Sequence, residues 1–458
     1  MKRIRQILGS DRSASLDEGF TLIEVIVALA VFSIIALTVA GAITNSLVIT
    51  RDSRSRAVAE NLASQDLDLD RSVSDIMNVQ TKTWTTTVQN TPYTIARKVS
   101  WSTSATTSNA CGTGSGTLQY KIVKVTVSWP GSGTTNPVVS TTNLAPNSRL
   151  NDPTLGTIIV AVTAADGSGA SGVSVSIAPA SSNPNGAAAV ATPAVTDSNG
   201  CTYALKVTPG NYTVSINRAN GIDYTQATTP VTTPVVVTAG TATSVPFTYD
   251  TAATVTLKYA SNYSGTATLP TNLDTTFNST TGGVDLFQLG AKTTATTPSV
   301  SLFPFTSGYT YETGAYVAPI VGSSGTVSNT PCVNVDPGAW ITQNSSKQVG
   351  TSFQAPTSPG GTATINVPMG VVQLPALSGT LSLQATQVNT SANGDPGCST
   401  AVTYSFGSLS GSPVIALPFG TWRITTAALI VVKPSSVKTA GVVNSDSTVT
   451  LDPRGVTP

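Results

Sequence analysis

The longest apolar run of the chain lies near its beginning, between Phe20 and Thr50, and Glu24 is the only formally charged residue within it. A helix rises about 1.5 Å per residue and needs roughly 20 apolar residues to cross a bilayer, so this run is long enough. The pattern therefore predicts a membrane-spanning helix over 20–50. A charged side chain in such a span is costly unless it finds a partner, which makes Glu24 a candidate functional residue.

The helical pattern continues beyond the apolar run. Between residues 51 and 76, apolar side chains recur three to five positions apart among charged ones, as expected for one stripe on a helix. We therefore expect a single helix over 20–76. Asp66, Asp68 and Asp70 alternate here, but the glycine and distal glutamate of an EF-hand loop are missing. We interpret these three residues as a solvated helix face.

After the helix, the pattern changes to alternating apolar and polar positions, which is typical of β-strands. Residues 93–101 and 120–129 are two such segments, and the second is followed by the turn signal Pro130-Gly131. Residues 147–153 form a polar connection with two asparagines and a proline. The sequence therefore predicts a small β domain over 77–150.

Three further segments alternate in the same way, with turn residues between the strands, and we expect β-sandwiches over 151–250, 251–370 and 371–458. Thr208-Pro-Gly-Asn-Tyr212 in the first of them is matched by Leu417-Pro-Phe-Gly-Thr-Trp422 in the third. Internal repetition of this kind is typical of tandem structural units. The predicted fold class is mainly β, with one long N-terminal α-helix.

Composition excludes several functional classes. The chain has 458 residues, a formal net charge of +1 and no histidine, so Ser-His-Asp triads, Cys-His dyads and histidine-containing zinc sites are excluded. Glutamate occurs at four positions, and no pair of aspartates has a recognisable hydrolase spacing. We therefore predict that the protein is not an enzyme, and we assign it no catalytic residue, no metal and no cofactor. Its charge gives no strong nucleic-acid signal.

The residues around the start of the apolar run resemble a known signature. A leader with four basic residues ends at Gly19, and Phe20 and Thr-Leu-Ile-Glu24 follow in unbroken register. This order resembles the prepilin family, which comprises type IV pilins and the pseudopilins of type II secretion. The resemblance implies that a membrane prepilin peptidase removes the leader, 1–19, between Gly19 and Phe20, and that the new Phe20 amine is methylated. Ordinary secretory signals are cut after the apolar region.

The resemblance also implies a role for Glu24 in filament assembly. In filaments of this family, the glutamate of an entering subunit pairs with the terminal amine of a neighbour, which here is the amine of Phe20. A glutamate that reaches back to the lipid headgroups is the rival interpretation. The implied partners are other pilin subunits and the pilus assembly platform. The basic leader favours a cytoplasmic N-terminus, so the implied location is the cytoplasmic membrane before assembly and an extracellular filament or the cell surface afterwards.

Residues 155–248 resemble a second family, the prealbumin-like sandwich of carboxypeptidase regulatory domains and of Gram-positive surface stalks. Asp197-Ser-Asn-Gly200 and Pro209-Gly-Asn-Tyr212 carry this resemblance. Asn-Gly is a hairpin turn signal, and Pro-Gly makes the turn before the last strand. We expect Tyr212 to pack into the sandwich.

Four cysteines, Cys111, Cys201, Cys332 and Cys398, are present. An even number in an exported chain indicates disulfides, whereas the long spacings and the lack of a CxxC motif disfavour a metal site. Cys201 and Cys398 occupy equivalent positions in their repeats, and each follows a cysteine in the preceding segment. This arrangement favours the pairs Cys111–Cys201 and Cys332–Cys398.

These features lead to one functional hypothesis and two alternatives. The hypothesis is a large type IV pilus subunit whose bulky β domains make a minor or tip position more suitable than the major one. The β domains would then serve adhesion to a host or surface ligand. The alternatives are a pseudopilin of type II secretion or competence DNA uptake, and a membrane-anchored surface receptor.

Overall fold

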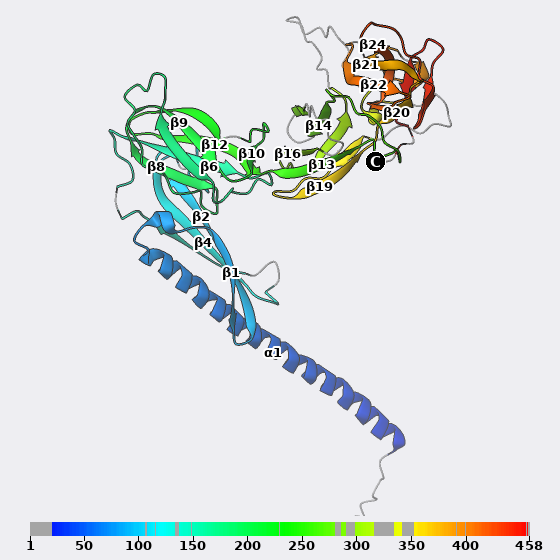
Figure 1. Ribbon diagram of the computed structural model, residues 1–458. Coiled ribbons are helices and arrows are strands. Elements are labelled where there is room, and N and C mark those ends of the chain that lie inside the picture. The colour runs from blue at the N-terminus through cyan, green and yellow to red at the C-terminus, as the bar shows by residue number, and fades with distance from the viewer. Residues whose placement is uncertain are drawn as a thin grey trace, which may run out of the picture. The chain divides into compact units, whose positions relative to one another are not determined.

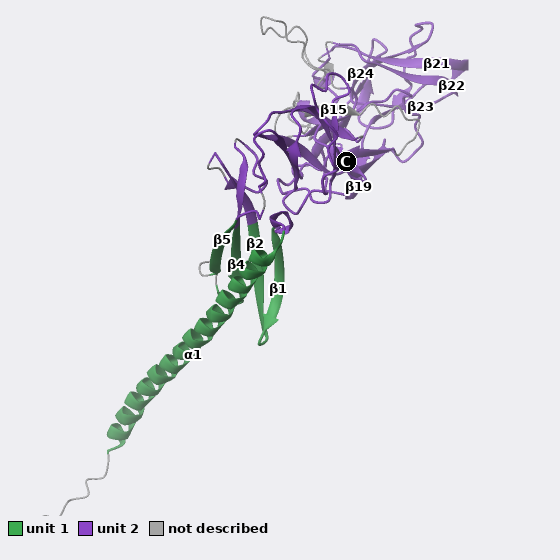
Figure 2. Ribbon diagram, turned by 90° about the vertical axis from the view of Figure 1, so that its left-hand side faces the viewer, with its two compact units in different colours: residues 1–74, 81–98, 123–144 green, residues 75–80, 99–122, 145–458 purple. Residues whose placement is uncertain are grey.

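The structure is a computed structural model, and it describes residues 21–105, 108–114, 116–132, 137–147, 149–228, 230–279, 285–289, 298–315, 334–340, 352–390, 392–398, 400–454 and 456. It contains one long helix followed by many short strands in small sheets (Figure 1). The predicted fold class, mainly β with one long N-terminal helix, is therefore confirmed. The chain divides into two compact units (Figure 2), an N-terminal unit of residues 1–74, 81–98 and 123–144, and a C-terminal unit of residues 75–80, 99–122 and 145–458.

The long helix, α1, spans Leu22–Ser72. It ends four residues before the predicted end at residue 76, and Val73 is already extended. Ser and Asp side chains compete for nearby backbone groups and therefore favour helix ends and turns. Asp75 does so here, because its carboxylate accepts a hydrogen bond from Met77 N at 2.9 Å and caps a separate 3-10 turn, η1 (Ile76–Asn78).

The first sheet follows the helix in sequence and has the order β1-β2-β4-β5, with β3 paired to β2. The predicted strands 93–101 and 120–129 correspond to β2 and β4. Strands β1 and β2 form a hairpin whose two turn residues, Gln89 and Asn90, have φ angles of 48° and 62°, as a type I′ turn requires. The strands are β1 (Lys82–Val88), β2 (Thr91–Thr103), β3 (Ser108–Asn109), β4 (Leu118–Ser128) and β5 (Val138–Leu144).

Two sheets over residues 156–251 share one hydrophobic core. Their orders are β10-β12-β6-β8 and β11-β9-β7, and β6 and β12 run parallel. Inward positions alternate with exposed ones along the strands, and Ile158, Val160, Tyr212 and Val214 are fully buried between the sheets. The strands are β6 (Gly156–Thr163), β7 (Ser174–Pro179), β8 (Cys201–Val207), β9 (Gly210–Asn217), β10 (Gly221–Asp223), β11 (Val231–Val237) and β12 (Ala242–Thr251).

Four sheets follow, with the orders β16-β13-β19, β15-β14-β17-β18, β23-β20-β25 and β22-β21-β24-β27-β26. Short 3-10 turns η2 (Pro337–Ala339) and η3 (Ala392–Gly394) connect some of the strands. The strands are β13 (Ala253–Tyr259), β14 (Thr275–Ser279), β15 (Asp285–Leu289), β16 (Ser299–Leu302), β17 (Tyr309–Thr313), β18 (Phe353–Ala355), β19 (Thr362–Val367), β20 (Gly370–Gln373), β21 (Leu377–Gln387), β22 (Thr403–Gly411), β23 (Val414–Leu417), β24 (Gly420–Thr426), β25 (Ser436–Val437), β26 (Gly441–Val443) and β27 (Val449–Leu451).

The hydrophobic core of these four sheets continues through residue 370, where the sequence suggests a boundary. One cluster of buried side chains includes Phe277 on one side of that position and Trp422 on the other. Hydrogen bonds also cross it, because Gln387 Nε2 donates to Asn334 Oδ1 at 2.7 Å and Thr271 N donates to the carbonyl oxygen of Ser405 at 2.7 Å. The described residues between 253 and 451 therefore share one interior, and they do not pack as two separate domains.

Candidate functional site on the N-terminal helix

The first part of α1 is exposed along its whole length. All residues from 22 to 50 are exposed, and the most apolar 18-residue stretch of the helix has no buried residue. Leu22, Phe32 and Leu37 are 80%, 68% and 74% exposed. Soluble monomers rarely expose so large a contiguous apolar surface, which normally marks a membrane or protein contact. By length and composition this helix is able to cross a membrane.

Glu24 lies in the first turn of α1 and forms a capping box with Thr21. The Glu24 carboxylate accepts hydrogen bonds from Thr21 N at 3.2 Å and from Thr21 Oγ1 at 3.1 Å, and Thr21 Oγ1 accepts one from Glu24 N at 3.4 Å. These bonds satisfy donors that the helix start leaves unpaired, and the carboxylate faces the positive end of the helix dipole. The Thr-x-x-Glu spacing is a capping-box signal that the sequence analysis missed.

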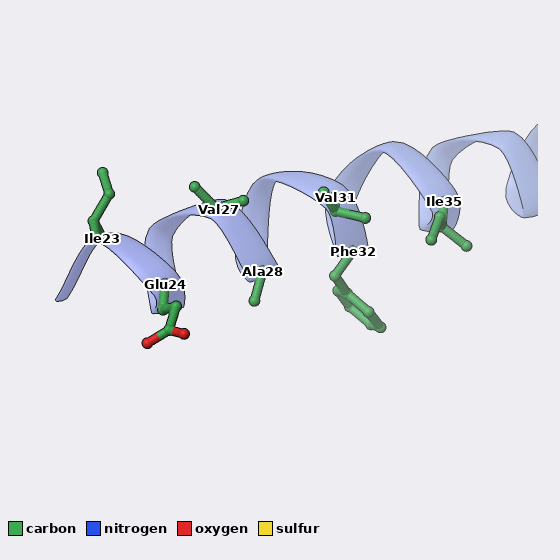
Figure 3. A pocket seen from close by; sticks show the side chains of 7 residues that line it. All are labelled: Ile23, Glu24, Val27, Ala28, Val31, Phe32 and Ile35. Carbon is green, nitrogen blue, oxygen red and sulfur yellow. The ribbon is translucent and has the colours of Figure 1, made fainter. Parts of the chain in front are cut away.

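The Glu24 carboxylate also borders a shallow apolar recess. Glu24, Ala28 and Phe32 project from one side of this helix face, and Ile23 and Val27 project from the other (Figure 3). The small side chain of Ala28 leaves the space between its neighbours open. The recess is therefore an apolar surface with one carboxylate beside it. Gly19 and Phe20, which the sequence predicts as the cleavage and methylation site, lie outside the described residues.

The last part of α1 is held against the sheet by buried polar residues. Asp66 and Asp70 are 6% and 3% exposed, and Arg97 of β2 forms an ion pair with Asp70 and places its Nε 3.7 Å from Asp66 Oδ2. Asp68 lies on the exposed side and pairs with Arg71 at 2.8 Å. The interpretation of all three aspartates as a solvated face is therefore wrong for Asp66 and Asp70. Residues four apart share one helix face, whereas residue 68 lies on the opposite one.

Electrostatics in this buried cluster are dominated by desolvation. Burial raises the pKa of Asp66 above its ordinary value of 3.8, and the nearby charges of Arg97 and Lys82 only partly oppose that rise. The guanidinium of Arg97 also lies over the ring of Trp84, 5.5 Å from its centroid. A stripe of small buried residues on α1, Ser55, Ala59 and Ala63, precedes the cluster and allows close approach of the helix to the sheet.

One predicted disulfide is confirmed. Cys111 and Cys201 are bonded, with their Cα atoms 5.3 Å apart. Cys398 is also disulfide-bonded, but Cys332 lies outside the described residues, so the pair Cys332–Cys398 stays a prediction. In the described part of the chain no cysteine is free, and no group of three or more metal-ligating side chains lies close enough to hold a metal ion.

The beginning of the chain matches a known protein family. Residues 15–40 match the family described as the prokaryotic N-terminal methylation motif. The chain carries the methylation motif of type IV pilins. This motif implies processing by prepilin peptidase and assembly of the pilus type. It covers the predicted cleavage site and the first part of the apolar run, and no enzyme family accompanies it.

Comparisons with solved structures give only weak likenesses. The Bacillus anthracis TIE protein is 13% identical at a TM-score of 0.21, covering 84% of this chain and 74% of that one. The streptococcal ancillary pilin is 12% identical at a TM-score of 0.20, covering 62% and 80%. The major pilin subunit BcpA of Bacillus cereus is 11% identical at a TM-score of 0.19, covering 65% and 91%. These likenesses are too weak to support an inference. No curated protein matches the chain in sequence.

Proposed function

We propose that the protein is a large, minor or tip subunit of a type IV pilus or a related filament. The exposed apolar half of α1 is the observation that carries this proposal. A helix with no buried residue over 22–50 needs an apolar environment along its whole length. A membrane supplies that environment before assembly, and the packed helices of neighbouring subunits supply it afterwards.

Processing between Gly19 and Phe20 gives this helix a cationic end close to Glu24. In hydrocarbon neither the amine nor the carboxylate is stable alone, so each favours a partner of opposite charge. The capping box leaves Glu24 accessible, because the residue is exposed and borders an apolar recess. The Phe20 amine of a neighbouring subunit is the partner that we propose.

The β domains make up most of the chain and form the displayed part of the subunit. Their bulk disfavours identical packing at every position along a filament, which supports a minor or tip position. Adhesion to a host or surface ligand is the role that we propose for them. Purified filaments with and without this subunit should differ in binding to host cells or coated surfaces, and equal binding would reject the adhesive role.

The N-terminus of the protein from its native cells provides the direct test. Mass spectrometry of the N-terminal peptide should find methylated Phe20 as the first residue. A chain that retains residues 1–19 would reject prepilin processing and leave a membrane-anchored protein. A start beyond residue 50 would reject the membrane helix as a part of the mature protein.

A further inference from the structure

A recess opens where the apolar run of α1 ends and the β1–β2 hairpin approaches the helix. It has a volume of about 410 Å³, and we call it the hairpin recess. All of its residues belong to the N-terminal unit. The helix contributes Leu47, Thr50, Arg51, Arg54, Ser55 and Val58, and the hairpin contributes Val88, Gln89, Thr91 and Tyr93.

Two arginines without a counter-ion line this recess. Arg51 and Arg54 are three residues apart on α1, which places their Cβ atoms about 5–6 Å from each other on one helix face. Within the described residues, neither guanidinium has a hydrogen-bond or ion-pair partner. Arg56, by contrast, lies outside the recess and pairs with Glu60 at 3.3 Å. The recess is therefore a cationic site whose charge no described side chain neutralises.

The remaining polar groups of the recess suit a phosphate. Ser55 and Thr91 bring hydroxyl groups and Gln89 brings an amide, whereas the Thr50 hydroxyl already donates to the carbonyl oxygen of Ser46 at 2.8 Å; no carboxylate is among the lining residues. Guanidinium groups bind phosphate oxygens in a bidentate manner, and neutral donors add hydrogen bonds to the same oxygens. The chemistry of the recess is thus complementary to a phosphate ester.

The position of the recess along α1 favours a lipid as the source of that phosphate. The segment 22–50 is about 43 Å long at 1.5 Å per residue, which matches a bilayer of about 40–45 Å including its headgroups. Arg51 and Arg54 then lie at the headgroup level of the outer leaflet. Helical side chains also tilt toward the helix N-terminus, which directs both arginines back toward the lipids. Leu47 gives the recess an apolar edge on that side.

We propose that the hairpin recess binds the phosphate group of an anionic membrane lipid through Arg51 and Arg54. The proposal rests on the proposed function in one respect, because it requires the segment 22–50 to lie in the membrane. A subunit held in this way has a lipid bound at its outer end until it leaves the bilayer. The two arginines then define the depth of the helix in the membrane.

Lipid binding by the full-length protein tests this proposal. The protein is reconstituted into vesicles of phosphatidylcholine mixed with phosphatidylglycerol, floated on a density gradient, extracted in mild detergent and analysed by native mass spectrometry for retained lipid. Wild-type protein should retain phosphatidylglycerol in preference to phosphatidylcholine. The double variant Arg51→Gln/Arg54→Gln should lose at least tenfold of that preference. Arg56→Gln, which removes a charge outside the recess, should keep it.

Other outcomes would overturn the proposal. If Arg56→Gln lost as much of the lipid preference as the single variants Arg51→Gln and Arg54→Gln, the protein would be attracted to any anionic surface and not through the recess. Inorganic phosphate or glycerol phosphate that displaces the lipid at equimolar concentration would identify a soluble phosphate as the ligand. Wild-type protein that floats without a lipid preference rejects the recess alone, whereas wild-type protein that does not float rejects the membrane helix as well.

A charge-conserving variant guards against a folding artefact. Arg51→Lys/Arg54→Lys keeps both charges but replaces each planar fork with a compact ammonium. It should float like wild type and retain phosphatidylglycerol severalfold less well. Wild-type retention by this variant would contradict bidentate recognition in the recess.

Discussion

Tyr212 and Trp422 occupy the same place in two different sheets, and each donates a hydrogen bond to the carbonyl oxygen four residues before it. Tyr212 Oη lies 2.8 Å from the oxygen of Thr208, and Trp422 Nε1 lies 2.9 Å from the oxygen of Pro418. Both rings are fully buried. The internal repeat therefore extends beyond sequence pattern, because a phenol and an indole close the same turn before β9 and β24.

The hydroxyl group of Tyr212 should be important for the stability of the first sandwich. It donates to Thr208 and accepts a hydrogen bond from Ala188 N at 3.0 Å. Tyr212→Phe leaves both backbone groups without this partner, and we expect a loss of about 1–3 kcal/mol. Hydrogen exchange of the Ala188 amide measures the loss locally. Tyr224→Phe is the control, because Tyr224 is 49% exposed. A similar loss of stability in both variants would contradict this role of the Tyr212 hydroxyl group.

Capping and charge at Glu24 can be separated by two substitutions. Glu24→Gln keeps the capping box, since glutamine also serves at this position, but removes the negative charge. Thr21→Ala removes the cap and keeps the charge. If Glu24 pairs with the amine of a neighbour, Glu24→Gln should abolish incorporation into filaments, while Thr21→Ala should reduce helix stability by about 0.5–2 kcal/mol and still allow incorporation. Immunoblots of sheared filaments measure incorporation. If Thr21→Ala abolished incorporation and Glu24→Gln did not, Glu24 would act as a helix cap.

The stability of the helix–sheet contact should depend on the protonation of Asp66. Burial raises the pKa of this carboxyl above 3.8, so the folded state binds a proton more tightly than the unfolded state. The free energy of unfolding therefore falls as the pH rises from 3.8 through the raised pKa. Asp66→Asn should stabilise the protein at pH 7, and the gain should disappear at a pH below the unfolded-state pKa.

Asp68→Asn is the matched control for this pH dependence, because Asp68 is exposed and pairs with Arg71 at the helix surface. We expect a change within about 0.5 kcal/mol under acidic or neutral conditions. Thermal unfolding at about pH 3, below the ordinary pKa of Asp66, and at pH 7 measures both variants. A destabilising Asp66→Asn at neutral pH would mean that the attraction of Arg97 exceeds the cost of burial.

Loss of the Cys111–Cys201 disulfide should destabilise the C-terminal unit. The bond joins residues 90 positions apart in sequence, and removal of a native disulfide typically costs about 2–5 kcal/mol. We expect Cys111→Ala/Cys201→Ala to lower the free energy of unfolding in urea by that amount. Cys111→Ala alone should have nearly the same effect, since it already breaks the bond. An unchanged urea midpoint would contradict this prediction.

The shared core predicts that residues 253–451 unfold together. A chain that stops after residue 370 lacks Trp422 and Tyr404, which belong to the same core as Phe277. We expect β13, β14 and β17 of this truncated chain to lose hydrogen-exchange protection. A chain that stops after Thr251 should keep protection in β6 and β9, whose core is separate. Retained protection after the first truncation would mean that residues 253–367 fold independently.

The elements that the sequence predicts well are those defined by local pattern. The apolar run, the alternation in β2 and β4, and the repeat that contains Tyr212 and Trp422 all depend on residues close in sequence. The pair Cys111–Cys201 was predictable because repetition supplied the missing long-range information. The turn before β17 differs from those before β9 and β24, because Tyr309 Oη donates to the carbonyl oxygen of Phe303, six residues back, at 2.6 Å.

Features that depend on distant partners were not predictable. The sequence around Asp66 and Asp70 is typical of an exposed helix face, and only the approach of Arg97 from β2 explains their burial. The continuous core across residue 370 arises from packing between the segments before and after it. Each segment has its own regular alternation of apolar and polar positions, so the sequence does not indicate that they share a core. The hairpin recess combines residues of α1 with residues of a hairpin that follows later in the sequence, and neither part indicates a site by itself.

The disulfide between Cys111 and Cys201 also determines how the chain transmits mechanical load. When the chain is pulled from its two ends, force passes directly between these cysteines, and the residues between them carry none of it. Fully extended, a segment of 90 residues would add about 300 Å. The disulfide prevents this segment from extending, so strands β4 to β7 bear no tension even when the rest of the chain is stretched.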